Sequence, residues 1–495
     1  MNLGLGKPHE QAYALMRQGR PKEALALIEP WALRPDATHS TLACYATLLK
    51  GMERLEESLN VSRLAAERFP ASGVAWHNLA SVLGDLGRDD EAIEAARKAF
   101  ATGLDAPETW LVYARSLMGA RDLEAARAAF EDALKRRPGY IDAQTDLAQT
   151  IWIATEDADA AAAVFDEDPR HAPHRARVYK GAGLPEKALA VVEAALKRLP
   201  ESAILLQTAA TLALDAGRDP EALAYAAEAL RRAPHDPVML ETWAGACLVD
   251  DRIEEALQAC RRLVAMHPHN QSSLAMLAVA ARLAGAPEYE TLYDYDAFVR
   301  PGRILAPEGW PTLDAYLAEL KAALVRLHVA KAHPLDQSLR NGTQTNQDLR
   351  VSDEPAIKAF FKAIDPLVRD YMAAIGTGAG HPLRERNTGD YAVAGAWSVR
   401  LRPNGFHVNH MHPKGWLSSA FYVETPDAAL GSENHEGWIK FGQPNFRTKP
   451  MLEPARFVRP EPGRLVLFPS YMWHGTVPFT TQESRMTIAF DVVPA

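Results

Sequence analysis

Two short stretches near the end of the chain decide its fold: FHVNHMHP at residues 406–413 and FPSYMWHG at residues 468–475. Successive side chains of a β-strand point to opposite faces, so His410 and His412 share a face, whereas His407 is expected to point away. His474 belongs to a distant strand, and hydrogen bonding between neighbouring strands brings such positions together. Imidazoles are favoured ligands for iron, copper, zinc and nickel. The pattern therefore predicts that His410, His412 and His474 hold one metal ion inside a small β-barrel.

The sequence around these histidines has the period of a β-sheet from Tyr391 onward. Apolar and polar residues alternate at 397–402, and further short runs between glycine and proline turns read as strands at 417–423, 437–441, 464–468 and 486–490. Many short strands at this spacing predict a sandwich or a jelly roll, that is, a double-stranded β-helix.

A strand that follows His474 carries a second chemical signal. Arg485 and Thr487 share one face of this strand with Ala489, while the other face carries Met486, Ile488 and Phe490. If the apolar face packs against helices, the guanidinium and the hydroxyl point into the barrel. A buried arginine needs an anion, and its planar fork suits a carboxylate. A surface salt bridge is the alternative.

Upstream, residues 8–300 repeat with a period of 34. A small residue recurs at this step, and so does a proline; the positions are Ala24, Ser58, Ala92 and Ala126, then Ala188, Ala222 and Ala256, with Pro200, Pro234 and Pro268. The small residue lets two helices approach closely, and the proline marks the end of the second helix. The turn between them is expected at segments such as 87–92 and 217–222. The pattern resembles the tetratricopeptide (TPR) repeat, in about eight or nine helix–turn–helix units.

Stacked TPR units form an all-α superhelix whose concave face usually binds an extended peptide or a partner protein. Self-association of the array into a homo-oligomer is the alternative reading of the same pattern. Trp76, Trp110 and Trp243 are interpreted as packing residues between the helices of a unit rather than as groove residues.

The repeat is interrupted at residues 300–311, which contain three prolines and two glycines. An amphipathic helix follows, with leucines at helical spacing from Leu313 to Leu327, and a second helix is expected at about 353–375, kinked at Pro366. The polar run at 333–345 is read as an ordered loop at the site or as a solvated linker. We therefore expect a multidomain chain with a repeat array at 1–300, a linker and connecting helix at 301–330, and a jelly-roll domain with supporting helices at 331–495.

Composition excludes some classes of protein. The 495-residue chain has a formal net charge of −9, which argues against nucleic acid as a partner. Cys44, Cys247 and Cys260 lie far apart and are expected to be buried small residues. Neither a signal peptide nor an apolar run of membrane-spanning length is recognisable, so a cytoplasmic location without membrane association is the default expectation.

The C-terminal motifs resemble the 2-oxoglutarate/Fe(II) oxygenase superfamily, most closely a branch often joined to TPR arrays. The resemblance covers roughly residues 330–495, and its motifs are HMHP at 410–413, SAFY at 419–422, LFPS at 467–470, His474, RMT at 485–487 and the polar GTQT at 342–345. It implies Fe(II) and 2-oxoglutarate as cofactors, with His410 as the first metal ligand and His474 as the distal one. It also implies that Arg485 and Thr487, and with them Tyr422, hold 2-oxoglutarate.

The chain departs from this family at position 412, where histidine replaces the usual carboxylate ligand. His412 can still supply the third ligand, and Glu424 or Asp427 is the alternative. The resemblance implies a hydroxylase that uses O₂ on a peptide or protein bound by the TPR groove. Two other readings stay open: an oxygenase of a small molecule or sugar, with the array recruiting partners, and a non-enzymatic scaffold with a degenerate barrel.

Overall fold

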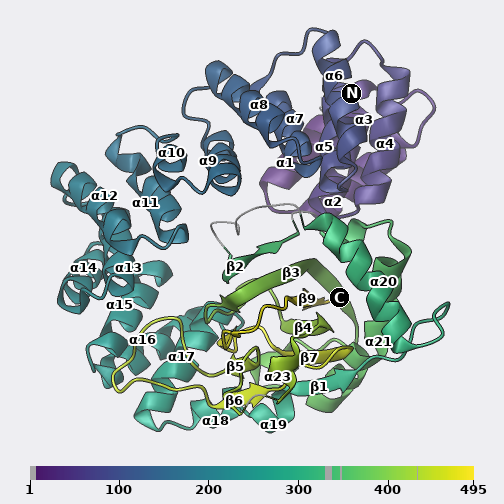
Figure 1. Cartoon of the computed structure of the whole chain (residues 1–495). Coiled ribbons are helices and arrows are strands. Elements are labelled where there is room, and N and C mark those ends of the chain that lie inside the picture. The colour runs from purple at the N-terminus through teal and green to yellow at the C-terminus, as the bar shows by residue number, and fades with distance from the viewer. Residues whose placement is uncertain (1–6, 329–336, 346–347, 432) are drawn as a thin grey trace. The chain divides into compact units, whose positions relative to one another are not determined.

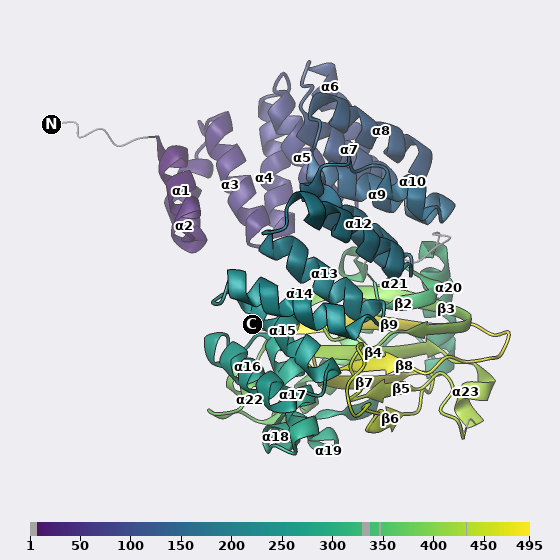
Figure 2. The ribbon, with the colours of Figure 1, turned by 90° about the vertical axis from the view of Figure 1, so that its left-hand side faces the viewer.

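The computed structural model describes residues 7–328, 337–345, 348–431 and 433–495. Contacts within the chain divide it into two compact units, Met1–Ile151 and Trp152–Ala495. The first unit consists of consecutive helices that pack as hairpins (Figures 1 and 2). These helices are α1 (Pro8–Arg17), α2 (Pro21–Ala32), α3 (His39–Gly51), α4 (Leu55–Arg68), α5 (Gly73–Asp85), α6 (Asp89–Ala101), α7 (Pro107–Gly119), α8 (Leu123–Arg136) and α9 (Ile141–Thr155), the last of which runs across the division.

The period of 34 sets the packing of this unit. The small residue at the repeated position is completely or almost completely buried in the second helix of each hairpin, at Ala24, Ser58, Ala92 and Ala126. The turn before that helix has a positive φ each time, at Gly19, Glu53, Gly87 and Arg121. Glycine adopts this left-handed conformation without cost, whereas Glu53 and Arg121 do not. The predicted helix–turn–helix units are confirmed, and the structure adds the left-handed conformation of their turns.

The second unit continues the helix pairs before its sheets begin. Its helices up to residue 298 are α10 (Ala158–Ala162), η1 (Pro169–His171), α11 (Ala172–Gly181), α12 (Pro185–Arg198), α13 (Ala203–Asp215), α14 (Asp219–Arg232), α15 (Pro237–Val249), α16 (Ile253–Met266), α17 (Gln271–Ala284), α18 (Glu288–Leu292) and α19 (Tyr295–Phe298). Ala188, Ala222 and Ala256 are again fully buried. Pro200, Pro234 and Pro268 each follow two residues after a helix end, as the sequence predicts.

Among the described residues of the same unit, nine strands form two antiparallel sheets. They are β1 (Arg300–Arg303), β2 (Leu339–Gln344), β3 (Tyr391–His407), β4 (Leu417–Glu424), β5 (Ile439–Phe441), β6 (Arg456–Val458), β7 (Arg464–Pro469), β8 (His474–Thr476) and β9 (Arg485–Pro494). One sheet has the order β1-β7-β4-β9-β3-β2, and the other has the order β6-β5-β8. The predicted strands are confirmed, while their closure into a jelly roll stays a prediction.

Two segments differ from the sequence-based expectation. Residues 300–303, placed at the start of the linker, pair with β7 as the edge strand β1. Residues 339–344, read as loop or linker, pair with β3 as strand β2. Polar and glycine-rich composition hides both strands, because an edge strand needs only one partner and no apolar face of its own. Residues 333–336 of the polar run lie outside the described residues.

Two helices cover the large sheet, α20 (Leu313–Leu327) and α21 (Pro355–Ile375) (Figure 1). Their apolar faces are buried as predicted, and α21 continues through Pro366. Phe360 of α21 packs against Phe421 and Phe490, which lie on neighbouring strands of the sheet. Short segments complete the unit: η2 (Leu349–Val351), α22 (Pro382–Glu385) and α23 (Asp427–Gly431).

Within the second unit, the repeat helices and the sheets share one hydrophobic core. The Tyr293 hydroxyl donates to the Tyr471 carbonyl at 3.1 Å and accepts from the Trp473 amide at 2.9 Å. Arg282 of α17 donates to the Gly442 carbonyl in the loop between β5 and β6. The second half of the array is therefore built together with the sheet region, and the domain boundaries at 300 and 330 stay predictions. None of the described helices combines the length and apolarity needed to cross a membrane.

Candidate metal centre

His410 and His474 are held together by their own backbones. The His410 amide donates to the His474 carbonyl at 2.8 Å, and the His474 amide donates to the His410 carbonyl at 2.9 Å. Two residues that exchange both bonds in an antiparallel bridge place their side chains on the same face. His412 lies two residues further on, and its amide donates to the Ser470 carbonyl at 3.0 Å. The backbone pairing therefore delivers three imidazoles to one side.

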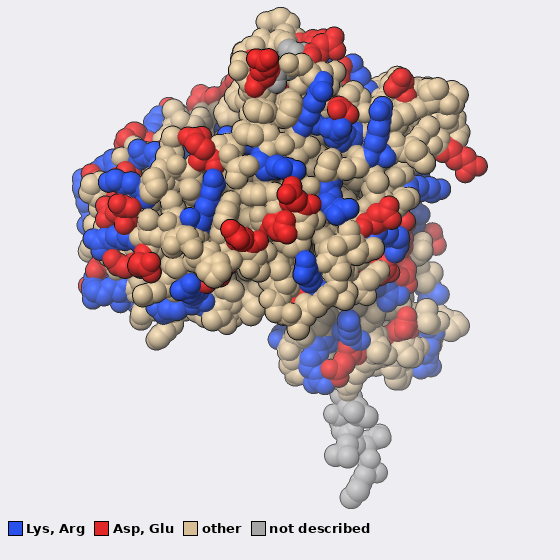
Figure 3. All heavy atoms as spheres, turned by 90° about the horizontal axis from the view of Figure 1, so that it is seen from below, with Lys and Arg blue, Asp and Glu red and all other residues tan. Residues whose placement is uncertain are grey.

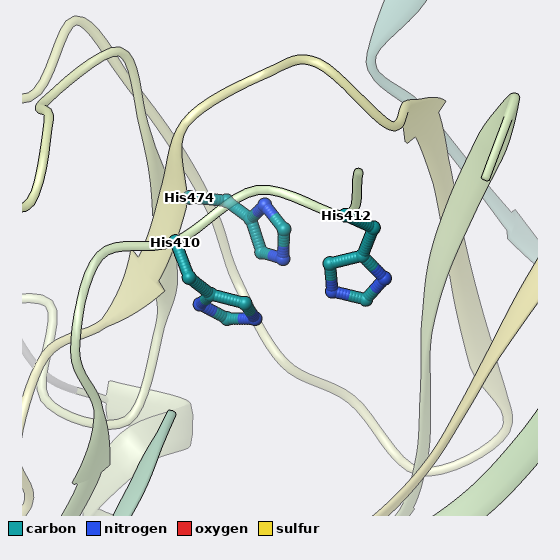
Figure 4. A group of neighbouring side chains, drawn as sticks. All are labelled: His410, His412 and His474. Atoms are coloured by element: carbon teal, nitrogen blue, oxygen red, sulfur yellow. The ribbon is translucent and has the colours of Figure 1, made fainter. Parts of the chain in front are cut away.

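The three rings converge on one point, as Figure 4 shows. One ligand atom from each of His410, His412 and His474 lies within 4.8 Å of the others, and the histidines are buried or partly buried. Metal–nitrogen bonds of about 2.0–2.1 Å at right angles place three facial ligand atoms about 3 Å apart, so each ring would move inward by up to about 1 Å to bind one ion. The residues present therefore fit a single metal ion.

The Nδ1 atom of each ring already has an oxygen partner. His410 contacts the Val408 carbonyl at 2.9 Å, and His474 contacts the Met472 carbonyl at 2.9 Å. An Nδ1–H group that donates in this way leaves Nε2 as the ligand atom and fixes the ring orientation. Burial lowers the pKa of His410 to about 3 and the pKa of His474 well below its usual value. Both rings are therefore neutral at neutral pH, the form that binds a metal.

Asp491 is a candidate site residue that the sequence pattern did not single out. Its Oδ1 atom lies 2.6 Å from His412 Nδ1 and accepts a second hydrogen bond from Ser418 Oγ at 2.7 Å. A carboxylate behind a ligating histidine orients the ring and makes it a stronger donor to the metal. The signal was present in the sequence, because Asp491 continues the alternation of Arg485, Thr487 and Ala489 on β9.

The two carboxylates considered in place of His412 lie elsewhere. Glu424 pairs with Lys321 and accepts from Ser484 Oγ at 3.0 Å. Asp427 begins α23, and its amide donates to Glu483. The structure thus brings His412, and not Glu424 or Asp427, beside His410 and His474.

His407 does not point away from the site as the strand parity predicts. Its ring centroid lies 5.8 Å from that of His410, and Ser338 Oγ contacts both His407 Nδ1 at 2.9 Å and His410 Nε2 at 3.3 Å. The reason is that β3 ends at His407, so strict alternation stops before His410. Burial holds the pKa of His407 well below its usual value. His407 is thus a neighbour of the three histidines and not one of the converging group.

Arg485 is almost completely buried, at 2% exposure, which excludes the surface salt bridge. Its Nε and Nη1 atoms are buried without a hydrogen-bond partner, and its guanidinium lies over the Tyr422 ring, 5.1 Å from the centroid. Tyr422 faces Thr487 across the β4–β9 pairing, so the two share a face of the sheet. Leaving two guanidinium donors unpaired in the interior is costly. The arrangement fits an anion that these donors bind.

The histidines and Arg485 line one cavity of about 670 Å³. This volume is within the range of small-molecule sites, about 300–1,000 Å³. Thr487 and Asp491 also line it, together with the apolar side chains Trp397, Val399 and Ile439. Two residues of the repeat helix α11, Arg177 and Lys180, line the same cavity. The metal group, the buried cation and part of the repeat array therefore open onto a shared space.

Parts of the chain match the models of known protein families. Residues 395–491 match the model of a family described as "Putative 2OG-Fe(II) oxygenase". Residues 74–101, 107–150 and 175–237 match tetratricopeptide repeat families. The chain therefore combines N-terminal TPR repeats with a C-terminal domain of this oxygenase family, and the resemblance seen in the sequence is confirmed.

Similar solved structures come from several bacteria. MamA from Desulfovibrio magneticus RS-1, from residue 41 to its end, is 18% identical with a TM-score of 0.29, over 33% of this chain and 93% of that one. The C-terminal part of a TPR repeat-containing protein from Cytophaga hutchinsonii is 16% identical, with a TM-score of 0.33, and the match covers 48% of this chain and 99% of that one. A tetratricopeptide repeat protein from Parabacteroides merdae is 14% identical, with a TM-score of 0.34, and the match covers 56% of this chain and 99% of that one. No curated protein matches the chain.

Proposed function

We propose that this protein is an Fe(II)- and 2-oxoglutarate-dependent dioxygenase that hydroxylates a side chain of a peptide or protein bound by its TPR groove. The observation that carries the proposal is the joint presence, in one cavity, of three converging imidazoles and a buried guanidinium with two unpaired donors. Bound Fe(II), together with 2-oxoglutarate and O₂, would supply oxidative decarboxylation of the cosubstrate coupled to hydroxylation of a substrate C–H bond.

His410, His412 and His474 would hold the metal through their Nε2 atoms and leave its other positions open, as three facial ligands do. Three neutral imidazoles give the site one negative charge fewer than two histidines and a carboxylate. Asp491 offsets part of this difference through its hydrogen bond to His412. Asp491 would thus orient the His412 ring and place a negative charge on the side of that ring opposite the metal.

Arg485 would bind the remote carboxylate of 2-oxoglutarate with the Nε and Nη1 donors that have no other partner. A carboxylate accepts two parallel bonds from a guanidinium, which gives affinity and also orientation. Thr487 and Tyr422 flank Arg485 on β9 and β4, and their hydroxyls can donate to the same group. The Tyr422 hydroxyl is buried without a hydrogen-bond partner, as expected for a group that waits for a ligand.

The apolar part of the cavity wall would keep water from the reacting atoms. Trp397 lies next to His412, with a centroid distance of 5.8 Å, and Val399 and Ile439 line the space beside it. Exclusion of water strengthens the electrostatic interactions in the site and prevents side reactions. TPR repeats generally mediate protein interactions, so a polypeptide is the substrate class that fits the whole chain best.

The test is anaerobic reconstitution with Fe(II), followed by measurement of bound iron and of succinate formed from 2-oxoglutarate in air. The parent protein should bind one iron per chain and form succinate, and His474→Ala should lose both. His235→Ala, an exposed histidine in the loop between α14 and α15, is the matched control and should behave like the parent.

Equal succinate formation by the parent and His474→Ala would overturn the proposal. Absence of iron and of any stabilisation by 2-oxoglutarate would favour the non-enzymatic scaffold instead. A small molecule or sugar as the substrate would show itself if succinate formation rose with such compounds and with no peptide. A cytoplasmic location and a homo-oligomer stay predictions. Size-exclusion chromatography with light scattering tests the oligomeric state.

A further inference from the structure

The charge of the cavity differs from the charge of the chain. The chain has a net charge of −9, whereas the charged residues that line the cavity are five cations and one carboxylate: Arg177, Lys180, Arg340, Lys414 and Arg485, with Asp491. On the face of the molecule seen in Figure 3, basic and acidic side chains are interspersed. The cations that line the cavity therefore outnumber its carboxylates, although the chain as a whole is acidic.

The proposed cofactors do not use this excess. The two charges of Fe(II) and the two of 2-oxoglutarate cancel, and Arg485 is the cation assigned to the cosubstrate. Asp491 is already engaged by His412 and Ser418. The other four cations that line the cavity are not assigned to a cofactor.

Arg340 is the most informative of the four. It lies on the edge strand β2 and is partly buried, and its Nη1 atom donates only to backbone carbonyls, of Gln337 and Leu339, each at 2.8 Å. No carboxylate forms an ion pair with it among the residues that the structure describes. Burial lowers the pKa of Arg340, as expected for a cation without an anionic partner. Its Nε and Nη2 atoms donate to none of the residues that the structure describes.

The other cations lie on separate elements around the same space. Lys414 is exposed and follows the histidine segment directly. Lys180 of α11 pairs with Asp215 of α13 at 2.8 Å, and Arg177 lies one helical turn before it. A compact ligand would reach one or two of these side chains. An extended chain could reach cations on β2, directly after the histidines at 410–412, and on α11 at once.

We propose that the substrate is an acidic polypeptide segment, with Asp or Glu side chains near the oxidised residue that pair with Arg340 and Lys414. This inference rests on the proposed oxygenase function and narrows it to a substrate class. Positive potential in a concave site also raises the association rate of an acidic partner and makes its binding sensitive to salt.

Binding is tested with the full chain and fluorescein-labelled peptides of equal length that alternate Gly with Glu, Gln or Lys, followed by fluorescence anisotropy. We expect the Glu peptide to bind at least about ten-fold more tightly than the Gln peptide, and its affinity to fall as salt rises. Arg340→Gln should weaken Glu-peptide binding by about five-fold or more, and Lys414→Gln by about two- to five-fold. Lys362→Gln, which removes an exposed charge from α21, is the matched control and should bind like the parent.

Equal affinity for the Glu and Gln peptides, or an unchanged affinity in both Arg340→Gln and Lys414→Gln, would overturn the inference. So would displacement of the Glu peptide by free glutamate at the same carboxylate concentration, because a small anion would then suffice. Lys414 is exposed, so its variant reports even if Arg340→Gln fails to fold. Succinate formed from 2-oxoglutarate without peptide is measured in parallel. If succinate forms but the Glu peptide binds no better than the Gln peptide, the acidic substrate class is refuted and the oxygenase function stands. If the Glu peptide binds better but no succinate forms, the oxygenase function is refuted and the acidic binding site stands.

Discussion

The repeat helices and the sheet region differ in how far along the chain their contacts reach. Between repeats, Arg63 pairs with Glu91 and Arg115 pairs with Asp146, 28 and 31 residues apart. In the metal centre, His412 contacts Asp491 across 79 residues, and Ser338 contacts His410 across 72. The array repeats one helix–turn–helix unit with the same local packing, so the period and a few turn residues specify its structure. The centre exists only when strands far apart in the sequence pair in one register.

This difference predicts how each region responds to change. Substitutions in the first unit should affect stability and leave the chemistry of the cavity unchanged, because each repeat there contacts mainly its neighbours. Substitutions in the centre should affect ligand binding more than stability, because several of its polar groups are not used within the fold.

The largest effect is expected at Arg485. Arg485→Met removes the guanidinium whose Nε and Nη1 have no partner, so 2-oxoglutarate affinity should fall by about 2–5 kcal/mol. The same change removes two unpaired buried donors, so the ligand-free protein should melt at an equal or higher temperature. Calorimetric titration and scanning calorimetry measure the two quantities. Arg456→Met, an exposed arginine paired with Asp296, is the control, and unchanged 2-oxoglutarate affinity in Arg485→Met would assign the cosubstrate to another group.

A substitution in the first unit gives the opposite profile. Ala126 is fully buried in α8, whereas Ala128 on the same helix is exposed. Ala126→Leu inserts atoms where two helices are in contact and should destabilise the protein by about 1–3 kcal/mol. Ala128→Leu should change stability by less than about 0.5 kcal/mol. Scanning calorimetry compares them, and metal affinity is measured on both; loss of metal by Ala126→Leu in the folded protein would mean that the two regions are coupled.

The centre can be dissected further at Asp491. Asp491→Asn keeps an oxygen that can accept from His412 Nδ1 and removes the charge, whereas Asp491→Ala removes both. We expect metal affinity to fall by about ten-fold in the first and by up to about 100-fold in the second, the usual range for a partner of a ligating histidine. Competition with a metal chelator measures this. Equal loss in both variants would show that charge alone matters, and no loss in either would remove Asp491 from the site.

The sequence predicts these two regions to different depths for physical reasons. The positions of Ala92 and Gly87 have the same structural role in successive repeats, because each repeat needs the same close contact between helices and the same left-handed turn. Parity within one strand correctly grouped Arg485 with Thr487. Parity failed for His407, since alternation holds only while the strand stays regular. The strand at 339–344 was missed because its pairing with β3, and not its composition, makes it a strand.

The smallest effect should appear at the turns of the array, where the chain itself supplies the comparison. Arg121 and Gly87 occupy the same place in successive repeats, with φ of 73° and 66°. Arg121→Gly should stabilise the first unit by about 0.5–1 kcal/mol, because glycine adopts this conformation without strain, although part of the gain is lost to the greater freedom of the unfolded chain. Gly87→Ala should destabilise it by about 1 kcal/mol for the converse reason. Scanning calorimetry on both variants measures these changes in stability. Changes of the same sign would mean that the two turns are not equivalent, and that the period of 34 specifies the helices but not the conformation of the turn between them.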